Sequence, residues 1–207
     1  MLRIVAGEFK GRALAGPKGD AIRPTSERHR GSLFDILEHG LAFDMKGVRV
    51  LDLFSGTGAL GLEALSRGAR TCVFVEEGVE GRGLLRTNIE ALGLGGRTKV
   101  FRRDATRLGA AGTLEPFDIV MADPPYGKRL GEAALEAALS GGWLRADALA
   151  VLEEGKGASF SPIAGFDLLD ERDMGASVLR FLRVSQEKSE KPCLLYTSDA
   201  ADEEDSV

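Results

Sequence analysis

From residue 48 onward the chain repeats one pattern: an apolar strand, a turn that often contains glycine, and then a helix. The predicted strands are VRVLDLF, TCVFVEE, TKVFRRD, FDIVMADPP and ALAVLEEG, and the predicted helices are GALGLEALSRG, LLRTNIEALGL and GEAALEAALSGG. A further helix between TKVFRRD and FDIVMADPP is only weakly indicated. Continuously apolar strands that alternate with helices are typical of a parallel sheet covered on both faces.

The last part of the pattern is different. FDLLDERDMGASVLRFLR indicates two strands joined by a turn around Met174–Gly175, which is an antiparallel hairpin. A plain dinucleotide-binding domain would continue with parallel strands. We therefore predict an α/β fold of the Rossmann-like class I methyltransferase type, with a mostly parallel seven-stranded sheet and an antiparallel C-terminal hairpin.

The N-terminal segment predicts a small addition to this sheet. LRIVAGEFKGRAL alternates like a hairpin, with Gly7 or Gly11 at the bend. RPTSERHRGSLFDILEHG predicts a helix that Thr25 or Ser26 caps and that ends near Gly40.

We expect three regions from these patterns. Residues 1–45 form an N-terminal hairpin and helix, residues 46–185 form the sheet domain, and residues 186–207, where the periodicity disappears, form a disordered or foreign tail. No apolar span approaches the roughly 20 residues of a transmembrane helix. The start lacks the apolar block of a secretory signal, so we expect a cytoplasmic protein.

Composition excludes other classes of site. With two cysteines and two histidines, the chain predicts neither a disulfide framework nor a metal centre. No apolar stripe remains after the core is assigned, which favours a monomer.

The net charge of −5 is unevenly distributed. The last fifteen residues hold five acidic and no basic side chains, whereas residues 1–30 hold seven basic against three acidic ones, a net charge of +4. Such a local positive segment can bind a polyanion even when the whole chain is acidic. A solvated basic surface is the simpler alternative.

The first predicted strand runs into a glycine loop, VLDLFSGTGALG, with Gly56, Gly58 and Gly61 spaced as in a nucleotide-binding fingerprint. Glycines allow a tight turn and close approach of a ligand to the backbone. By itself the spacing also fits a dehydrogenase, or a tight turn without a ligand.

Acidic residues at the strand ends indicate which cofactor the glycine loop would bind. Asp52 lies at the end of the strand, where it would repel a pyrophosphate but suits the ammonium and sulfonium charges of S-adenosylmethionine. Glu76 ends the second strand and can accept hydrogen bonds from ribose hydroxyls. Asp104 ends the third strand and can accept from an adenine amino group, while the Ala105 N–H can reach a ring nitrogen. The arrangement favours S-adenosylmethionine over a nicotinamide cofactor.

The fourth strand ends in a corner of four residues, Asp123-Pro124-Pro125-Tyr126. This corner lies at the carboxyl edge of the predicted sheet, as the glycine loop does. The Asp123 carboxylate and the Pro124 carbonyl can accept the hydrogens of an exocyclic amine, so that its lone pair is localised for methyl transfer. Prolines hold both acceptors in place. Tyr126 offers a flat face on which an extruded base can stack. The alternative is a proline turn that merely ends a strand.

At this point the chain resembles a known family. LDLFSGTGALGLEALSRGA together with DPPY resembles the amino-methyltransferases of nucleic acids, and RIVAGEFKGRAL with RPTSERHRGSLFDIL narrows the resemblance to the bacterial guanine-N2 methyltransferases of small-subunit 16S ribosomal RNA. The resemblance covers residues 2–184, and it implies that residues 1–45 are an RNA-binding hairpin and helix and that residues 46–185 are the methyltransferase domain. It implies that S-adenosylmethionine methylates one guanine N2, conventionally numbered 966, on the assembled or assembling small subunit.

The resemblance also implies roles for individual residues. The expected catalytic residues are Asp123, Pro124, Pro125 and Tyr126, and the expected cofactor-binding residues are Asp52, Phe54, Ser55, Gly56, Gly58, Glu76, Asp104 and Ala105. The expected RNA-binding residues are Arg3, Lys10, Arg12, Arg23, Arg28, Arg30, Lys128 and Arg129, the last two beside the RNA backbone.

The chain departs from the family pattern at two places. Gly31 stands where an acidic residue is expected, which weakens that helix. Gly81 and Gly83 lie in the second helix of the sheet domain, so we expect an irregular start there.

Other functions remain open from sequence. A DNA amino-methyltransferase would use the same corner but usually carries a separate target-recognition domain, for which this chain has no room. A protein-glutamine methyltransferase is less favoured, because that class carries Asn where Asp123 stands. A catalytically idle RNA-binding assembly factor and a nicotinamide-dependent oxidoreductase are the alternatives from other classes.

Overall fold

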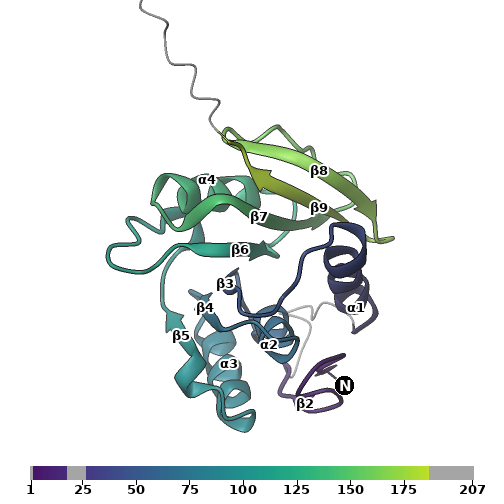
Figure 1. Cartoon of the computed structure of the whole chain (residues 1–207), viewed down its shortest axis with the longest axis vertical. Coiled ribbons are helices and arrows are strands. Elements are labelled where there is room, and N and C mark those ends of the chain that lie inside the picture. The colour runs from purple at the N-terminus through teal and green to yellow at the C-terminus, as the bar shows by residue number, and fades with distance from the viewer. Residues whose placement is uncertain (1, 18–26, 187–207) are drawn as a thin grey trace, which may run out of the picture.

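A computed structural model of the 207-residue chain describes residues 2–17 and 27–186, and its main feature is a seven-stranded sheet (Figure 1). The strand order is β5-β4-β3-β6-β7-β9-β8. In chain order the strands are β3 (Arg49–Leu53), β4 (Thr71–Val75), β5 (Thr98–Phe101), β6 (Phe117–Ala122), β7 (Leu144–Gly155), β8 (Phe166–Asp173) and β9 (Ser177–Val184).

Strands β5, β4, β3, β6 and β7 pair in parallel, and β9 then pairs antiparallel with both β7 and β8. Met174 and Gly175 lie in the turn between β8 and β9, as the sequence predicts. The predicted fold class, a Rossmann-like class I methyltransferase sheet with an antiparallel end, is confirmed.

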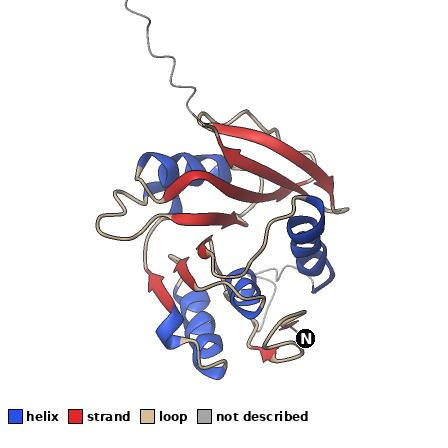
Figure 2. Cartoon of the chain, in the orientation of Figure 1, coloured by secondary structure: helices blue, strands red, loops and turns tan. Residues whose placement is uncertain are grey.

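Helices cover both faces of the sheet (Figure 2). A core forms on each face, because alternate residues of one strand point to opposite faces. One core joins the sheet to α2 (Ala59–Ser66), α3 (Val79–Ala91) and the N-terminal segment. The other joins it to α4 (Leu130–Ser140) and to the fully buried Trp143. No helix among the described residues is long and apolar enough to cross a bilayer.

Two local expectations differ from the structure. The segment between β5 and β6 contains the 3-10 turn Ala105–Arg107 in place of the weakly indicated helix, and another 3-10 turn, Gly95–Arg97, precedes β5. The expectation of an irregular start to α3 is wrong, since the helix runs from Val79 through both glycines. Gly81 is explained by space, because a Cβ there would lie 3.0 Å from the carboxylate carbon of Glu76.

The N-terminal segment forms the predicted hairpin and helix. Strands β1 (Leu2–Arg3) and β2 (Ala13–Leu14) pair antiparallel, and both Gly7 and Gly11, between them, have positive φ. Helix α1 (Glu27–Asp35) continues into a π-helical turn, Ile36–Gly40, which ends at the predicted glycine. The expected caps Thr25 and Ser26 lie outside the described residues, as does the expected tail beyond residue 186.

A buried carboxylate on α2 attaches this segment to the sheet domain. Glu63 is fully buried and accepts hydrogen bonds from the Val5 N–H at 2.8 Å and the Ala6 N–H at 2.9 Å. It also pairs with Arg30 at 3.3 Å and with Arg67 at 3.1 Å. Donors from three segments thus satisfy one buried charge and fix the hairpin and α1 against α2.

We therefore expect Glu63→Ala to lower the free energy of unfolding by about 3–5 kcal/mol, because it leaves the buried Arg30 guanidinium without its carboxylate. Urea titration followed by circular dichroism measures this loss. Amide exchange should accelerate first in residues 2–15.

Glu8→Ala is the matched control. Glu8 pairs with Arg97 at 3.5 Å, but its side chain is 63% exposed to solvent. An exposed pair contributes about 0–1 kcal/mol, so this variant should unfold close to the unmodified protein. Equal losses in the two variants would contradict a special role for the buried pair.

Candidate active site at the carboxyl edge of the sheet

The parallel pairing brings the carboxyl ends of β5, β4, β3, β6 and β7 to one edge. Along the chain, β3 is followed on one side by β4 and β5, whereas β6 and β7 lie on its other side. Such a switch in direction opens a crevice at the strand ends, and ligands of open α/β sheets bind there. The glycine loop follows β3 and the corner Asp123–Tyr126 follows β6, so they flank this switch.

The glycine loop has the backbone conformation that its sequence predicts. Phe54, Gly56 and Gly58 all have positive φ, of 56°, 53° and 80°. Gly58 precedes the first residue of α2, and a Cβ there would lie 2.3 Å from Leu85. The loop therefore depends on glycine for both conformation and space.

The side chains of Phe54 and Ser55 serve the shape of this loop. Phe54 packs against the core on the α4 side. The buried Ser55 hydroxyl donates to the Asp52 carbonyl at 2.6 Å and accepts from the Val75 N–H at 3.1 Å, so it joins the ends of β3 and β4. If the loop holds a cofactor, these two residues contribute through their backbone.

Glu76 follows β4 directly and reaches the glycine loop. Its carboxylate accepts from the Gly56 N–H at 2.7 Å and the Gly78 N–H at 2.6 Å. The side chain is half-buried, so it retains a solvent-facing side on which ligand hydroxyls can bind. The space beside Gly81 accommodates this carboxylate.

Asp52 lies within β3 and is 1% exposed. It accepts from the Gly61 N–H at 3.0 Å. Burial raises the pKa of this carboxyl to about 8, although the Gly61 hydrogen bond opposes the rise, and the negative charges of Asp123 and Glu76 add to it. The charges of Asp123 and Glu76 thus reach Asp52 at this edge, and their field favours a cationic ligand.

Asp104 and Ala105 lie after β5. The Asp104 carboxylate caps the following 3-10 turn, accepting from the Thr106 N–H at 2.8 Å and from its hydroxyl at 2.7 Å. These hydrogen bonds lower the pKa of Asp104. Ala105 is buried. One carboxylate oxygen of Asp104 is therefore already used locally.

The four residues of the corner after β6 differ in their exposure to solvent. Asp123 is half-buried and Pro124 is buried, whereas Pro125 and Tyr126 are exposed. Gly131, at the start of α4, allows close packing on Pro124, because a Cβ there would lie 3.3 Å from the Pro124 ring. Packing therefore holds the backbone of the corner in place.

Two acidic residues that sequence reasoning missed hold this corner from β7. The Tyr126 hydroxyl donates to Glu153 at 2.9 Å, and the Gly127 N–H donates to Glu154 at 3.3 Å. Burial, above all, and the Glu153 charge raise the pKa of the Tyr126 hydroxyl. Two acids at the end of the apolar run ALAVLEEG, at the same edge as the other acids, were the available signal.

A pocket of about 260 Å³ opens beside the residues that follow the corner. Its lining residues are Gly127, Arg129, Glu154, Gly157, Ala158 and Ser159. Burial raises the pKa of Glu154, and the neighbouring Glu132 charge adds to the effect. Among the residues described, no group of three or more His, Cys, Asp and Glu side chains could hold a metal ion.

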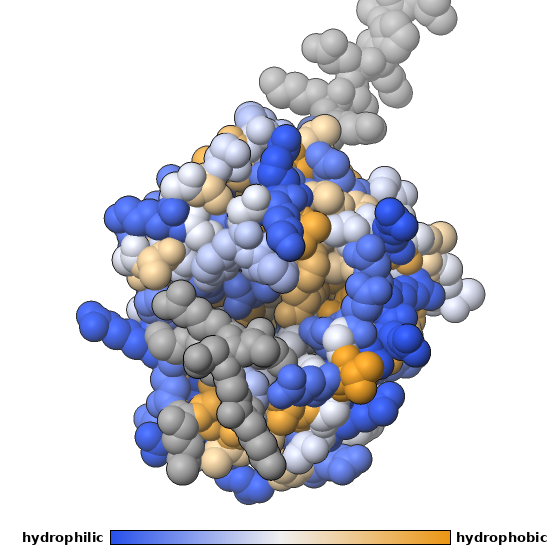
Figure 3. Space-filling view, turned by 180° about the vertical axis from the view of Figure 1, so that it is seen from behind, coloured by the Kyte–Doolittle hydropathy of each residue, from blue (hydrophilic) through white to orange (hydrophobic). Residues whose placement is uncertain are grey.

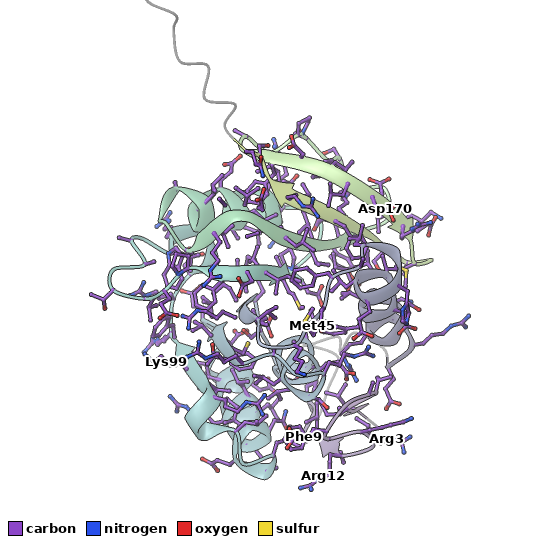
Figure 4. All side chains as sticks on the ribbon, viewed as in Figure 1. Arg3, Phe9, Arg12, Met45, Lys99 and Asp170 are labelled. Carbon is purple, nitrogen blue, oxygen red and sulfur yellow. The ribbon has the colours of Figure 1, made fainter. Side chains whose placement is uncertain are left out.

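The predicted RNA-binding residues separate into exposed and structural ones. Arg3 and Arg12 lie on the hairpin, far from Asp170 on β8 (Figure 4). The Arg12 guanidinium donates to the Ala91 carbonyl at 3.0 Å, at the end of α3. The other exposed residues of this set are Lys10, Arg28, Lys128 and Arg129, and Arg23 lies outside the described residues.

The prediction for Arg30 needs correction. Its side chain is fully buried, pairs with Glu63 and donates to the Arg3 carbonyl, so it cannot contact RNA directly. An arginine in a basic stretch gives no sequence signal of burial, because its carboxylate partner lies 33 residues away.

The surface around these residues is mixed. Seen from behind, hydrophilic residues separate smaller apolar areas (Figure 3). The exposed large apolar side chains among the described residues are Val79, Tyr126, Leu168 and Leu169. Tyr126 lies at the corner, whereas Leu168 and Leu169 lie on β8, at the opposite edge of the sheet from β5.

Comparison with known proteins agrees with this geometry. The family model described as "Conserved hypothetical protein 95" matches residues 2–183. "Ribosomal RNA small subunit methyltransferase D" of Escherichia coli (strain K12) is 36% identical over 152 residues, which cover 73% of this chain and 74% of the relative. The candidate rRNA methyltransferase YlbH of Bacillus subtilis is 39% identical over 136 residues, covering 65% and 72%.

Solved structures show the same fold. The candidate methyltransferase yhhF of Escherichia coli superposes with a TM-score of 0.73 at 31% identity, over 88% of this chain and 97% of that one. Because the family model spans nearly all described residues, the chain belongs to this family, that of the bacterial small-subunit ribosomal RNA methyltransferases.

Proposed function

We propose that the chain transfers a methyl group from S-adenosylmethionine to the exocyclic N2 amine of a guanine in 16S ribosomal RNA, with guanine 966 the expected nucleotide. The observation that carries the proposal is the position of the Asp123–Tyr126 corner beside the glycine loop, across the switch point of the sheet. The relatives named for methylation of small-subunit ribosomal RNA support the substrate class. We expect the protein to act as a monomer in the cytoplasm.

The residues at the edge fit the proposed cofactor. The charges of Glu76 and Asp123 oppose ionisation of the buried Asp52 carboxyl, and a ligand with ammonium and sulfonium charges would offset that repulsion. Glu76 would hold the ribose, Asp104 and Ala105 the adenine, and the backbone of Phe54–Gly58 the methionine part. When bound there, S-adenosylmethionine supplies the activated methyl group.

The corner supplies the groups that prepare the amine. The Asp123 carboxylate and the Pro124 carbonyl accept its two hydrogens, which localises a lone pair that is otherwise delocalised into the ring. Tyr126, 37% exposed, provides the stacking face for the extruded base. Because Pro124 is packed against α4, the acceptors need little reorganisation during the reaction.

The hairpin and α1, within the proposed RNA-binding region 1–45, supply the basic surface for RNA. Arg3 and Glu27 join the two at 3.5 Å, and Lys10 and Arg28 extend into solvent from them. This surface is consistent with the net charge of +4 in residues 1–30. Lys128 and Arg129 would contact the RNA backbone beside the corner.

The chemical step is tested with Asp123→Ala. We expect a loss of roughly a hundredfold or more in the methyl-transfer rate, because removal of one preorganised electrostatic group typically has an effect of this size. Labelled S-adenosylmethionine and unmodified small subunits give the rate, and mapping of the labelled nucleotide gives the atom.

Glu115→Gln, an exposed carboxylate in the loop that leads into β6, is the control and should keep the rate. A wild-type rate in Asp123→Ala would favour a different mechanism. Binding without any transfer by the unmodified protein would favour an idle assembly factor. Preference for DNA would favour a DNA amino-methyltransferase, and NAD binding in place of S-adenosylmethionine an oxidoreductase.

The raised pKa of Asp52 predicts proton release on cofactor binding. Below pH 8 this carboxyl is largely protonated in the free protein, and a nearby cation lowers its pKa, so binding at pH 7 should release up to one proton. Calorimetry in buffers of different ionisation enthalpy measures the release.

Asp52→Asn should abolish this proton release and weaken binding. The same shift has a stability consequence: because the pKa in the folded protein lies above the ordinary value of 3.8, the stability of the free protein should fall as the pH rises from that value towards 8. The Asn variant should lack this dependence. Unchanged proton release in the variant would assign the proton to another group.

The RNA surface is tested by salt dependence. Lys10→Ala and Arg28→Ala should each weaken small-subunit binding and reduce the slope of log affinity against log salt by about 0.7–0.9 per lost phosphate contact. Lys99→Ala, on β5 and away from the hairpin (Figure 4), is the control. Equal slopes in all four proteins would remove the hairpin from the interface.

A further inference from the structure

Two contacts from β7 hold Tyr126 in one orientation. Its hydroxyl donates to Glu153 Oε1 at 2.9 Å. Its ring lies directly against the backbone of Gly155, where a Cβ would approach the Tyr126 Cδ2 to 2.9 Å and its Cβ and Cγ to 3.1 Å. Glu153, at the hydroxyl end of the ring, and Gly155, beneath the ring, are two positions apart on β7 and therefore lie on the same face of the sheet.

The Glu153 carboxylate is buried and only partly hydrogen-bonded. It is 5% exposed, and its second oxygen, Oε2, is buried without a hydrogen-bond partner among the described residues. Incomplete satisfaction of a buried acid is unfavourable for folding, which makes a purely stabilising role a poor explanation. The hydrogen bond from Tyr126 is therefore the contact that best explains a carboxylate at this position.

The next residue of β7 fastens the same loop from the opposite face. Glu154 accepts from the Gly127 N–H at 3.3 Å, and successive residues of a strand point to opposite sides. The end of β7 therefore binds Tyr126 and Gly127 through side chains on both faces of the sheet. This arrangement limits the movement of the ring relative to Asp123.

We propose that Glu153 is a positioning residue for the target base: it fixes the tilt of the Tyr126 ring, with Gly155 as the seat, so that the exposed ring face receives the extruded guanine. The inference rests on the proposed function. Glu153 would act on the base through its hydrogen bond with Tyr126. A ring fixed before binding orders the base without a further loss of side-chain freedom.

The experiment is a double-mutant cycle on methyl transfer to unmodified small subunits. Tyr126→Phe and Glu153→Ala should each lower kcat/KM by about tenfold, the loss expected for one hydrogen bond to a charged acceptor. The double variant should be no worse than either single one, because both remove the same contact. Glu153→Gln keeps an acceptor oxygen and should recover activity to within about threefold of the unmodified protein.

Gly155→Ala tests the contact between the Tyr126 ring and the Gly155 backbone without removing a polar group. It should lower kcat/KM by a similar factor, since the ring must shift to admit the methyl group. Glu136→Gln, an exposed acid on α4, is the charge-matched control and should have no effect. Affinity for S-adenosylmethionine, measured by calorimetry, should be unchanged in every variant.

A second readout does not need methyl transfer. Because the Glu153 hydrogen bond fixes the ring, Glu153→Ala should change the near-ultraviolet circular dichroism of Tyr126, and Tyr126→Phe identifies the signal. Wild-type kinetics in Tyr126→Phe, additive losses in the double variant, or a parallel loss of cofactor affinity would each overturn the proposal. If the unmodified protein methylates another atom, the proposed function is wrong. The double-mutant cycle would still measure the coupling between Tyr126 and Glu153.

Discussion

Parallel pairing of five strands is the constraint on which every candidate functional group depends. Because β5, β4, β3, β6 and β7 run in the same direction, their carboxyl ends meet at one edge. The chain switches from one side of β3 to the other before it forms β6. The glycine loop and the Asp123 corner therefore become neighbours, although three strands and two α-helices separate them along the chain.

The sheet edge and the N-terminal segment carry charges of opposite sign. The negative charges of Glu76 and Asp123 act on Asp52 at the sheet edge, which favours a cationic ligand there. The hairpin and α1 carry exposed basic side chains that favour a polyanion. A small positive ligand and a large negative one can therefore bind to one small domain without competing for the same charges.

The buried Glu63 carboxylate links these two surfaces. It holds the hairpin backbone at Val5 and Ala6, and the α1 side chain Arg30, against α2. Since α2 begins at the glycine loop, the basic surface has a fixed position relative to the site. Arg30 is buried as a consequence, and a charge that satisfies Glu63 is not available to RNA.

The alternation of strands and helices, the antiparallel end, the glycine loop and the acidic corner could all be predicted from the sequence, because hydrophobic periodicity and the backbone limits of glycine and proline are local properties. The burial of Arg30 could not, because its partner Glu63 lies on another helix. The same holds for Glu153, whose role depends on contact with Tyr126. The reason for Gly81 in α3 could not be predicted either, because it is the close approach of the Glu76 carboxylate. These three features emerged from the folded structure alone, since burial and close contact arise from packing between elements that are distant in the chain.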